Sequence, residues 1–372
     1  MSLVLNGTTG ISGTNALTGV TGVNSGQVGG RRNIVINGEM KVAQRATSAT
    51  GKTGGTSGYF ALDRWKLQDG TIGTGGRCTI AQIADGPAGF ANCLKISATT
   101  ADTSIDAREA LILQTRFEGQ DLQQLKKGTS SAEQVTVSFY VKGNAAALYV
   151  CELHDVDNGR NNTQSFAVTT DWNRIELTFA ADTSDPLDDD TAVSLSLNFW
   201  LHSGSNYSGG TFASNTWADI TLANTTAVAD RTSIYDSTDR TFFLTGVQME
   251  VGSTATDFES RSFGEELALC ERYFQLVPQV GLAYAGATTT VDTCVPYRTP
   301  MRAAPTITAI AAITVTNVTA ADFAQSSANI TGSISVGASS AHLRLGNFSS
   351  LTTSDMYLCR NGDMNVAAAA EL

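Results

Sequence analysis

The sequence contains few charged residues, few histidines and few prolines. Only 16% of its 372 residues are charged, below the quarter that is usual in globular domains, and only three are histidines. The formal net charge of −11 repels phosphate backbones and anionic lipids, so we expect no nucleic-acid binding and no membrane insertion. No apolar run is long enough to span a bilayer, and the N-terminus lacks the basic and apolar segments of a secretion signal. We therefore expect any action outside a cell to follow another route of release.

Sequence signatures of catalysis and of transition-metal binding are also missing. The sequence holds no G-x-S-x-G and no H-E-x-x-H motif, and none of its six cysteines forms a C-x-x-C pair. We therefore predict no catalytic residues, no enzyme activity, no zinc site and cysteines that act as small buried apolar side chains. A pair of carboxylates for glycoside cleavage is brought together in space and leaves no sequence signature, so a glycan-degrading enzyme (a depolymerase) stays an alternative.

Acidic residues gather in two segments that share features with calcium-binding loops. In residues 154–159 the glycine comes too early and the terminal acidic ligand is missing, which favours a turn between strands. The run Asp188, Asp189 and Asp190 favours a solvated loop, with a structural Ca²⁺ as the alternative. We expect no cofactor and no metal ligands.

The sequence is instead rich in apolar, threonine-containing segments that alternate with period two. Hydrophobic residues make up 42% of the chain. The alternation is clearest in residues 135–142, 175–179 and 193–202, and it is typical of antiparallel strands with one face in a core. Glycine- and aspartate-rich segments separate these runs. We predict an all-β fold with a β-sandwich or jelly-roll domain over residues 31–262.

A short connecting helix is predicted over residues 263–278. Ser262 and Glu265 have the spacing of a capping box, and apolar residues then recur at helical spacing. Pro278 is expected to end the helix, because proline cannot continue it.

Residues 279–372 are predicted to form a small C-terminal β-rich tip domain. Asn361 and Gly362 have the composition of a tight hairpin turn. Few large apolar residues are available to fill a core here. We therefore expect this domain, together with the apolar face of the connecting helix, to gain stability by forming a homotrimer.

Residues 1–30 contain no charged side chain and are rich in glycine. This composition cannot bury enough apolar surface to fold alone, so the segment is predicted to be an extended N-terminal tail. Either the tail is disordered or it becomes ordered against a partner.

Three aromatic residues are candidates for carbohydrate binding. Trp200 alternates with a core-facing row and lies on the polar side of its strand, and Tyr140 does the same beside Phe139. Trp217 lies in a loop rich in glycine, serine and asparagine. An aromatic ring flanked by amides and hydroxyls covers the C–H face of a sugar while its neighbours bond the hydroxyls. The alternative is that these rings pack against loops or neighbouring subunits.

Four phrases of the sequence resemble those of bacteriophage tail-fibre and receptor-binding proteins. They are NIVINGEMKVAQ at residues 33–44, FALDRW at 60–65, the run TGVQMEVGSTATDFESRSFGEELALCERYF at 245–274, and PMRAAP at 300–305. The opening MSLVLNGTTGISG also resembles the N-termini of phage fibres. The order of the alternating strand segments in residues 31–262 resembles that of jelly-roll carbohydrate-binding modules.

The resemblance implies a trimeric, non-enzymatic virion protein that is assembled in the host cytoplasm. Residues 1–30 would anchor it to other virion proteins, and the connecting helix would pack near the threefold axis. The fibre would attach to host surface polysaccharide or lipopolysaccharide. A capsid decoration or head fibre of the same fold is the first alternative. A sugar site in the C-terminal tip, around Tyr297 and Phe348, is the alternative to the sandwich.

Overall fold

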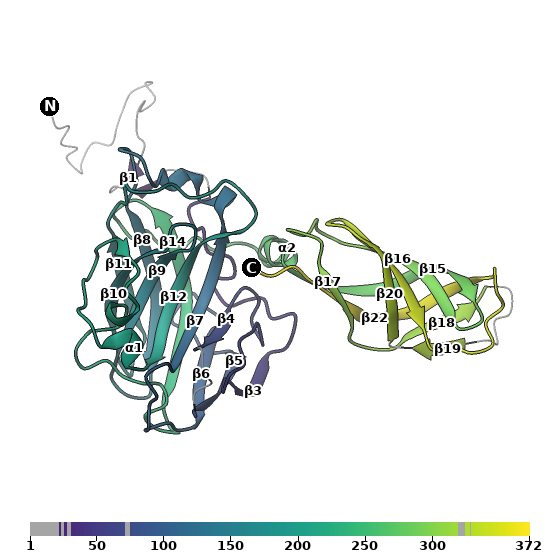
Figure 1. The fold of residues 1–372 in the computed structure, drawn as a ribbon, viewed down its shortest axis with the longest axis horizontal. Coiled ribbons are helices and arrows are strands. Elements are labelled where there is room, and N and C mark those ends of the chain that lie inside the picture. The colour runs from purple at the N-terminus through teal and green to yellow at the C-terminus, as the bar shows by residue number, and fades with distance from the viewer. Residues whose placement is uncertain (1–21, 24–25, 28–30, 71–74, 319–323, 328) are drawn as a thin grey trace.

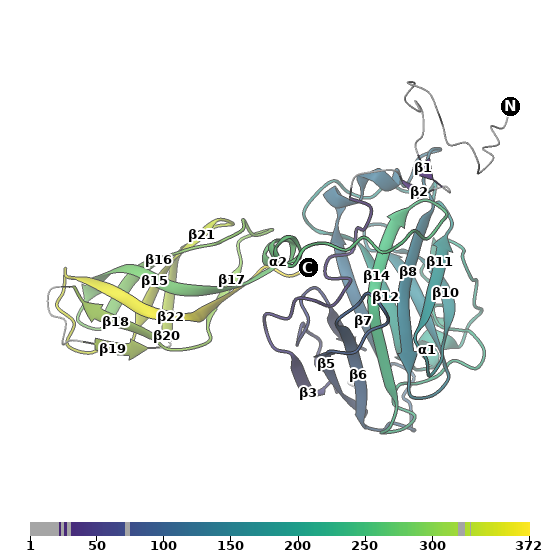
Figure 2. The same ribbon diagram turned by 180° about the vertical axis from the view of Figure 1, so that it is seen from behind.

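The computed structural model describes residues 22–23, 26–27, 31–70, 75–318, 324–327 and 329–372. The fold is all-β, as predicted, and consists of a β-sandwich followed by a narrower β-domain that projects from one side of it (Figures 1 and 2). Outside these two units, β1 (Gly22–Val23) pairs with β2 (Gly26–Gln27). None of the helices in the described residues is long and apolar enough to cross a membrane.

The sandwich is built from two six-stranded antiparallel sheets. The first sheet has the order β13 (Ala218–Asp219), β10 (Arg160–Val168), β9 (Ala147–Asp155), β12 (Val193–Ser203), β7 (Ala110–Glu118) and β4 (Lys66–Asp69). The second sheet has the order β11 (Asn173–Phe179), β8 (Val135–Gly143), β14 (Thr241–Val251), β6 (Cys93–Thr100), β5 (Arg77–Ile83) and β3 (Ser48–Lys52). The chain passes repeatedly from one sheet to the other, as in a jelly roll.

The predicted alternation places one apolar row of each strand in the core between the sheets. Phe139 of β8 packs edge-on against Phe199 of β12 and Phe166 of β10, with ring centroids 5.0 Å and 5.1 Å apart. These side chains are buried, and the ring geometry adds to the free energy gained from burying apolar area. The sandwich also contains four short helical turns: α1 (Ser205–Ser208), η1 (Gly119–Asp121), η2 (Gln123–Leu125) and η3 (Leu222–Asn224).

The C-terminal domain is a single sheet with its own core. Its strand order is β19 (Ala324–Ser327), β18 (Ile313–Asn317), β22 (Met356–Ala369), β15 (Phe274–Ala287), β16 (Thr290–Pro296), β21 (Ser340–Gly346) and β20 (Asn329–Val336), with β17 (Thr306–Ala309) also paired to β22. Fifteen of its described residues, mostly with small or medium aliphatic side chains, form its buried cluster.

The connecting helix starts where predicted but is shorter. α2 (Phe263–Glu271) has the predicted capping box: Ser262 accepts from the Glu265 backbone N–H, and Glu265 accepts from the Ser262 backbone N–H. The helix ends at Glu271, and the prediction that it extends to residue 278 is wrong. From Phe274 onward the backbone pairs with β22, and Pro278 lies at a register shift inside β15, where its missing N–H is tolerated.

The hairpin predicted at Asn361 and Gly362 is also wrong. Both residues lie within the continuous strand β22, whose backbone pairs with the irregular stretch of β15. Pairing between distant segments therefore overrides a local turn signal. The cysteine prediction holds for five of the six residues, which are buried, whereas Cys294 is exposed.

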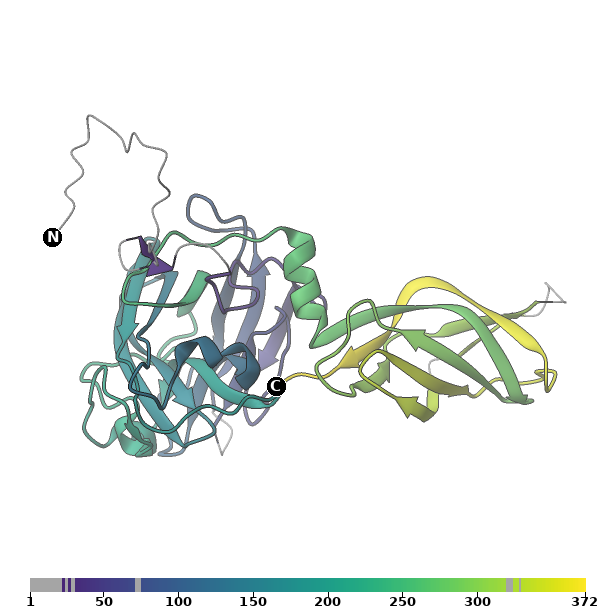
Figure 3. The same cartoon turned by 90° about the horizontal axis from the view of Figure 1, so that it is seen from above.

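The four phrases that carry the family resemblance meet at the junction between the two domains. Helix α2 lies at this junction (Figure 3). The Asn37 backbone N–H donates to the Glu266 carboxylate at 2.5 Å, and the Arg64 guanidinium lies 3.5 Å from the centroid of the Tyr273 ring. Arg302 donates through its backbone N–H to the Arg272 carbonyl at 2.8 Å. The phrases thus have a shared structural role, which is to fix the C-terminal domain to the sandwich.

Candidate functional site

A groove of about 400 Å³ runs over the outer face of the first sheet. Residues of strands β9, β12, β7 and β4 line its floor, and Ile220, Leu222 and Thr225, in and around η3, line one wall. The lining residues are Gln68, Ile112, Gln114, Arg116, Glu152, His154, Val156, Val193, Ser196, Asn198, Trp200, Ile220, Leu222 and Thr225.

Strand register places the polar side chains in adjacent rows. On β12 and β7, Trp200 is opposite Ile112, Asn198 is opposite Gln114, and Ser196 is opposite Arg116. Strand β9 continues the rows on the other side, with Glu152 opposite Asn198 and His154 opposite Ser196. Directly opposite residues of an antiparallel pair project from the same face. The groove therefore changes along its length from an indole at one end to a guanidinium at the other.

Glu152 organises the floor of the groove. Its Oε2 accepts hydrogen bonds from Trp200 Nε1 at 2.7 Å and from Asn198 Nδ2 at 2.9 Å. Its Oε1 accepts from Asn161 Nδ2 at 2.7 Å. Both carboxylate oxygens are thus held by donors from neighbouring strands, which fixes the orientation of the asparagine and the indole.

One acceptor beside the groove has no hydrogen-bond partner. Asn198 Oδ1 is buried and unpartnered among the described residues, and such an atom calls for a donor from a ligand or an ordered water. At the next position Arg116 Nε donates to Gln114 Oε1 at 2.6 Å. His154 and Gln68 are half-buried and add further polar groups.

Trp200 is part of this site, although it is not an exposed platform. Only 8% of the residue is exposed, and its ring packs against Tyr207 with centroids 5.2 Å apart. The indole therefore forms a wall of the groove, held by packing on one side and by Glu152 on the other.

Tyr140 and Trp217 lie elsewhere. Tyr140 is on β8, on the outer face of the second sheet, where its ring contacts Phe90 at 5.2 Å between centroids. Trp217 is half-buried against the sandwich core, and its Nε1 donates to the Ala180 carbonyl at 2.7 Å. The structure thus does not bring the three predicted residues together. The alternative sugar site in the C-terminal tip loses one of its two predicted residues, because Phe348 is buried in the core of the C-terminal domain.

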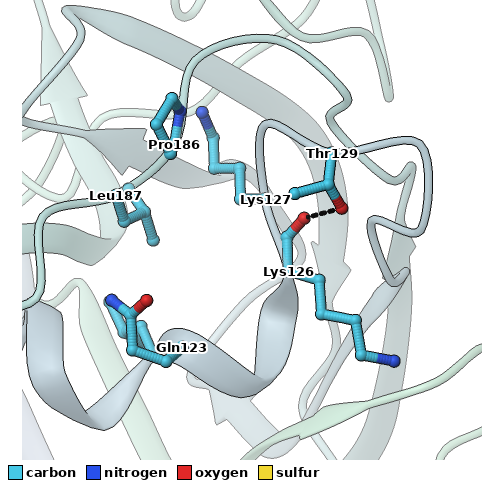
Figure 4. Close-up of a pocket in the computed structure, with 7 residues that line it drawn as sticks. Gln123, Lys126, Lys127, Thr129, Pro186 and Leu187 are labelled. Atoms are coloured by element: carbon cyan, nitrogen blue, oxygen red, sulfur yellow. Dashed lines mark hydrogen bonds between the residues drawn. The ribbon is translucent and has the colours of Figure 1, made fainter.

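A second hollow, of about 420 Å³, lies between η2 and the loop at Pro186 and Leu187 (Figure 4). Its polar groups are already satisfied within the protein. Lys127 Nζ pairs with Asp155 at 2.5 Å and Asp182 at 3.1 Å, and Gln123 Nε2 donates to the Gly119 carbonyl at 3.0 Å. Although slightly larger, this hollow offers a ligand fewer free polar partners than the groove.

The acidic segments that share features with calcium loops are held by internal contacts. Asp155 pairs with Lys127 and accepts from the Asn158 backbone N–H at 3.0 Å, which closes the turn expected there. Asp190 accepts from the Ala192 backbone N–H at 2.8 Å. No group of three or more histidine, cysteine, aspartate or glutamate side chains suited to a metal ion occurs in the described part of the chain.

Sequence reasoning missed Glu152, Gln114, Arg116 and His154. The available signal was alternation: residues 147–155 and 110–118 also alternate between core-facing and outward positions. No single segment of the sequence predicts that these strands flank β12, because the sheet order joins strands that are distant in the sequence.

No protein-family model matches the chain, and no curated protein matches it significantly. Among solved structures, it is similar to the family 11 carbohydrate-binding module of Clostridium thermocellum, with 13% identity, a TM-score of 0.28, and coverage of 56% of this chain and 99% of that one. A tandem pair of family 22 carbohydrate-binding modules from Paenibacillus barcinonensis Xyn10C gives 10% identity and a TM-score of 0.29 over 93% and 98% of the two chains. The enzymatically active domain of tailspike protein 4 of bacteriophage CBA120 gives 12% identity and a TM-score of 0.26 over 50% and 19%. Likenesses at this level carry no argument about function, and the sandwich itself is established by the strand pairings.

Proposed function

We propose that the groove on the first sheet binds a glycan chain, and that the protein is a non-enzymatic fibre of a bacteriophage virion that attaches to host surface polysaccharide or lipopolysaccharide. The observation that carries the proposal is the row of hydrogen-bonding side chains on adjacent strands, closed at one end by Trp200. Amide, hydroxyl and imidazole groups bond sugar hydroxyls, while an indole edge and aliphatic side chains cover the C–H faces.

The length of the groove favours an oligosaccharide over a single sugar. Trp200 and Ser196 are four residues apart on β12, which corresponds to about 13 Å of extended strand. Several sugar units can lie along such a floor, each contacting a different cross-strand pair.

The carboxylate content of the groove supports binding without cleavage. Glycoside hydrolysis generally uses two carboxyl groups that flank the scissile bond. Among the described residues that line the groove, Glu152 is the one carboxylate, and both of its oxygens accept hydrogen bonds from the protein.

An apolar face of the C-terminal domain supports a homotrimer. Leu282, Tyr284 and Met356 are 58%, 44% and 42% exposed, and Tyr284 is directly opposite Met356 in the β15–β22 pair. Their strand neighbours Ala283 and Tyr357 face the core, so this is the outward side of the sheet. Contact between copies of the chain would bury this face, and three chains would multiply weak glycan contacts through avidity.

Attachment to the virion is assigned to residues 1–30, on the resemblance of this segment to phage fibre N-termini. Apart from 22–23 and 26–27, these residues lie outside the described part of the chain. A tail mount and a capsid mount would use the same fold, and imaging of labelled protein on intact virions separates the two.

The experiment is a screen of the full-length protein on an array of bacterial surface polysaccharides, followed by calorimetric titration of an oligosaccharide from the strongest hit. Gln114→Ala should weaken binding about tenfold, because it removes a groove amide and the group that holds Arg116. Gln124→Ala, on the exposed surface of η2, is the matched control and should bind normally. Equal affinities for the two variants would contradict the assignment of the groove.

A further inference from the structure

Two cationic side chains lie together at the end of the groove away from Trp200. Arg116 of β7 is opposite Ser196, and Lys66 of the edge strand β4 is opposite Gln114. Lys66 and Arg116 are therefore diagonal neighbours on the outer face of the first sheet, and both are half-buried.

Neither cation has an ion-pair partner among the carboxylates of the described residues. Two other cations of the chain do have one: Arg64 pairs with Glu371 at 3.1 Å, and Arg272 pairs with Glu118 at 2.6 Å. Arg116 makes one side-chain hydrogen bond, from Nε to Gln114, which leaves its two terminal amino groups as donors. The Arg116 guanidinium thus keeps donors that a ligand can engage.

The surroundings do not cancel this charge. Glu371 is the acidic group that acts on Lys66, and its two oxygens are held by Arg45 at 2.7 Å and Arg64 at 3.1 Å. Burial lowers the pKa of the Lys66 ammonium, the Arg116 charge lowers it further, and Glu371 raises it. A chain with a net charge of −11 therefore carries a local positive site at one end of its groove.

We propose that this end of the groove is a subsite for an acidic group on the glycan, either the carboxylate of an acidic sugar or a phosphate substituent. The inference rests on the proposed glycan-binding function and specifies its ligand class. An anion bound here would lie between Lys66 and Arg116 and would offset the repulsion between these two positive charges. The Arg116 guanidinium can also bond carboxylate or phosphate oxygens in a forked, charge-assisted geometry. Because solvent ions screen the distant negative charges within about 10 Å, the local cations decide the interaction.

The test compares three probes by titration with the full-length protein: a polyuronate oligosaccharide, the same oligosaccharide with its carboxyl groups reduced to alcohols, and a phosphorylated oligosaccharide. We expect an acidic probe to bind at least about tenfold more tightly than the reduced one at low salt, and this preference to shrink as salt is added. The carboxylated and phosphorylated probes identify which anion the subsite prefers.

Lys66→Gln should abolish most of the preference for the acidic probe while leaving the affinity for the reduced probe within about twofold. Arg116→Gln should likewise abolish most of the preference, measured as the ratio of the two affinities. Arg344→Gln is the matched control, because it removes one positive charge from an exposed ion pair with Asp292 in the C-terminal domain. Two substituted positions keep the test valid if one variant fails to fold. Equal binding of the acidic and reduced probes would overturn the acidic subsite and leave the glycan-binding function standing. Failure of all three probes and of the polysaccharide array would overturn both.

Discussion

The indole N–H of Trp200 donates to Oε2 of Glu152 at 2.7 Å and joins β12 to β9 beneath the groove. Asn198 donates to the same oxygen at 2.9 Å, so one carboxylate orders two of the side chains that face the ligand. Hydrogen bonds to a carboxylate contribute more to the free energy of unfolding than hydrogen bonds to a neutral acceptor, and this carboxylate accepts three. This arrangement links the stability of the first sheet to the shape of the groove.

Glu152→Gln should therefore lower both stability and glycan affinity. The substitution replaces one acceptor oxygen by an NH₂ group that faces a donor, at a loss of about 1–3 kcal/mol in the free energy of unfolding. Urea unfolding and calorimetric titration measure the two effects. Glu176→Gln, at a half-exposed side chain on β11, is the control and should change neither quantity appreciably. A Glu152→Gln protein of normal stability would show that the carboxylate is not a structural centre.

Buried His202 should make the sandwich less stable in mild acid. Burial lowers its pKa from 6.5 to about 4, with Arg231 lowering it and Asp102 raising it by smaller amounts. Glu109 Oε2 lies 3.4 Å from His202 Nε2, and burial raises the pKa of that carboxyl. The lowered pKa of His202 makes its imidazole neutral near pH 7. Below pH 6.5 the imidazole of His202 binds a proton in the unfolded chain but not in the folded chain, so the free energy of unfolding falls until about pH 4.

The expected loss between pH 7 and pH 5 is about 2 kcal/mol of unfolding free energy. His202→Gln, which cannot titrate, should lose less over the same interval by that amount. If the two proteins had parallel pH profiles, His202 would not be the group responsible.

Charge on the apolar face of the C-terminal domain should disrupt the trimer. Leu282→Glu places a carboxylate beside Tyr284 and Met356, where contact between copies would have to desolvate it. Sedimentation equilibrium should show a trimer for the parent and a monomer for the variant. Ile334→Glu, on the edge strand β20 and not on β15 or β22, controls for the added charge and should remain trimeric. A parent protein that is monomeric at micromolar concentration would contradict the assembly outright.

Removal of residues 1–30 should leave a folded, soluble trimer that no longer joins virions. The segment has no strand-length apolar alternation and no charged side chain, so we expect it to contribute little to a core. The thermal midpoint of residues 31–372 and their incorporation into virions in complementation tests measure the two outcomes. Aggregation of the truncated protein would show that the tail belongs to the folded body.

The sequence predicted the elements whose signals are local. Alternation identified the core rows of β8 and β12, and the Ser262–Glu265 capping box identified the start of α2. Local signals predicted a helix end at Pro278 and a hairpin turn at Asn361, and both predictions are wrong. Both residues lie instead in strands of the long β15–β22 pair. Trp200 was found as one residue of a face, but its partners Glu152 and Gln114 come from strands about fifty and ninety residues earlier in the chain. Only the sheet order brings these side chains together.

The most direct test of the account is a crystal structure of the full-length protein with an oligosaccharide from the surface polysaccharide that it binds. The account predicts sugar rings along β12 and β7, with hydroxyls bonded to Asn198 and Gln114 and one ring against Trp200. Sugar bound instead over Tyr140 on the second sheet, or at the C-terminal domain near Tyr297, would contradict it.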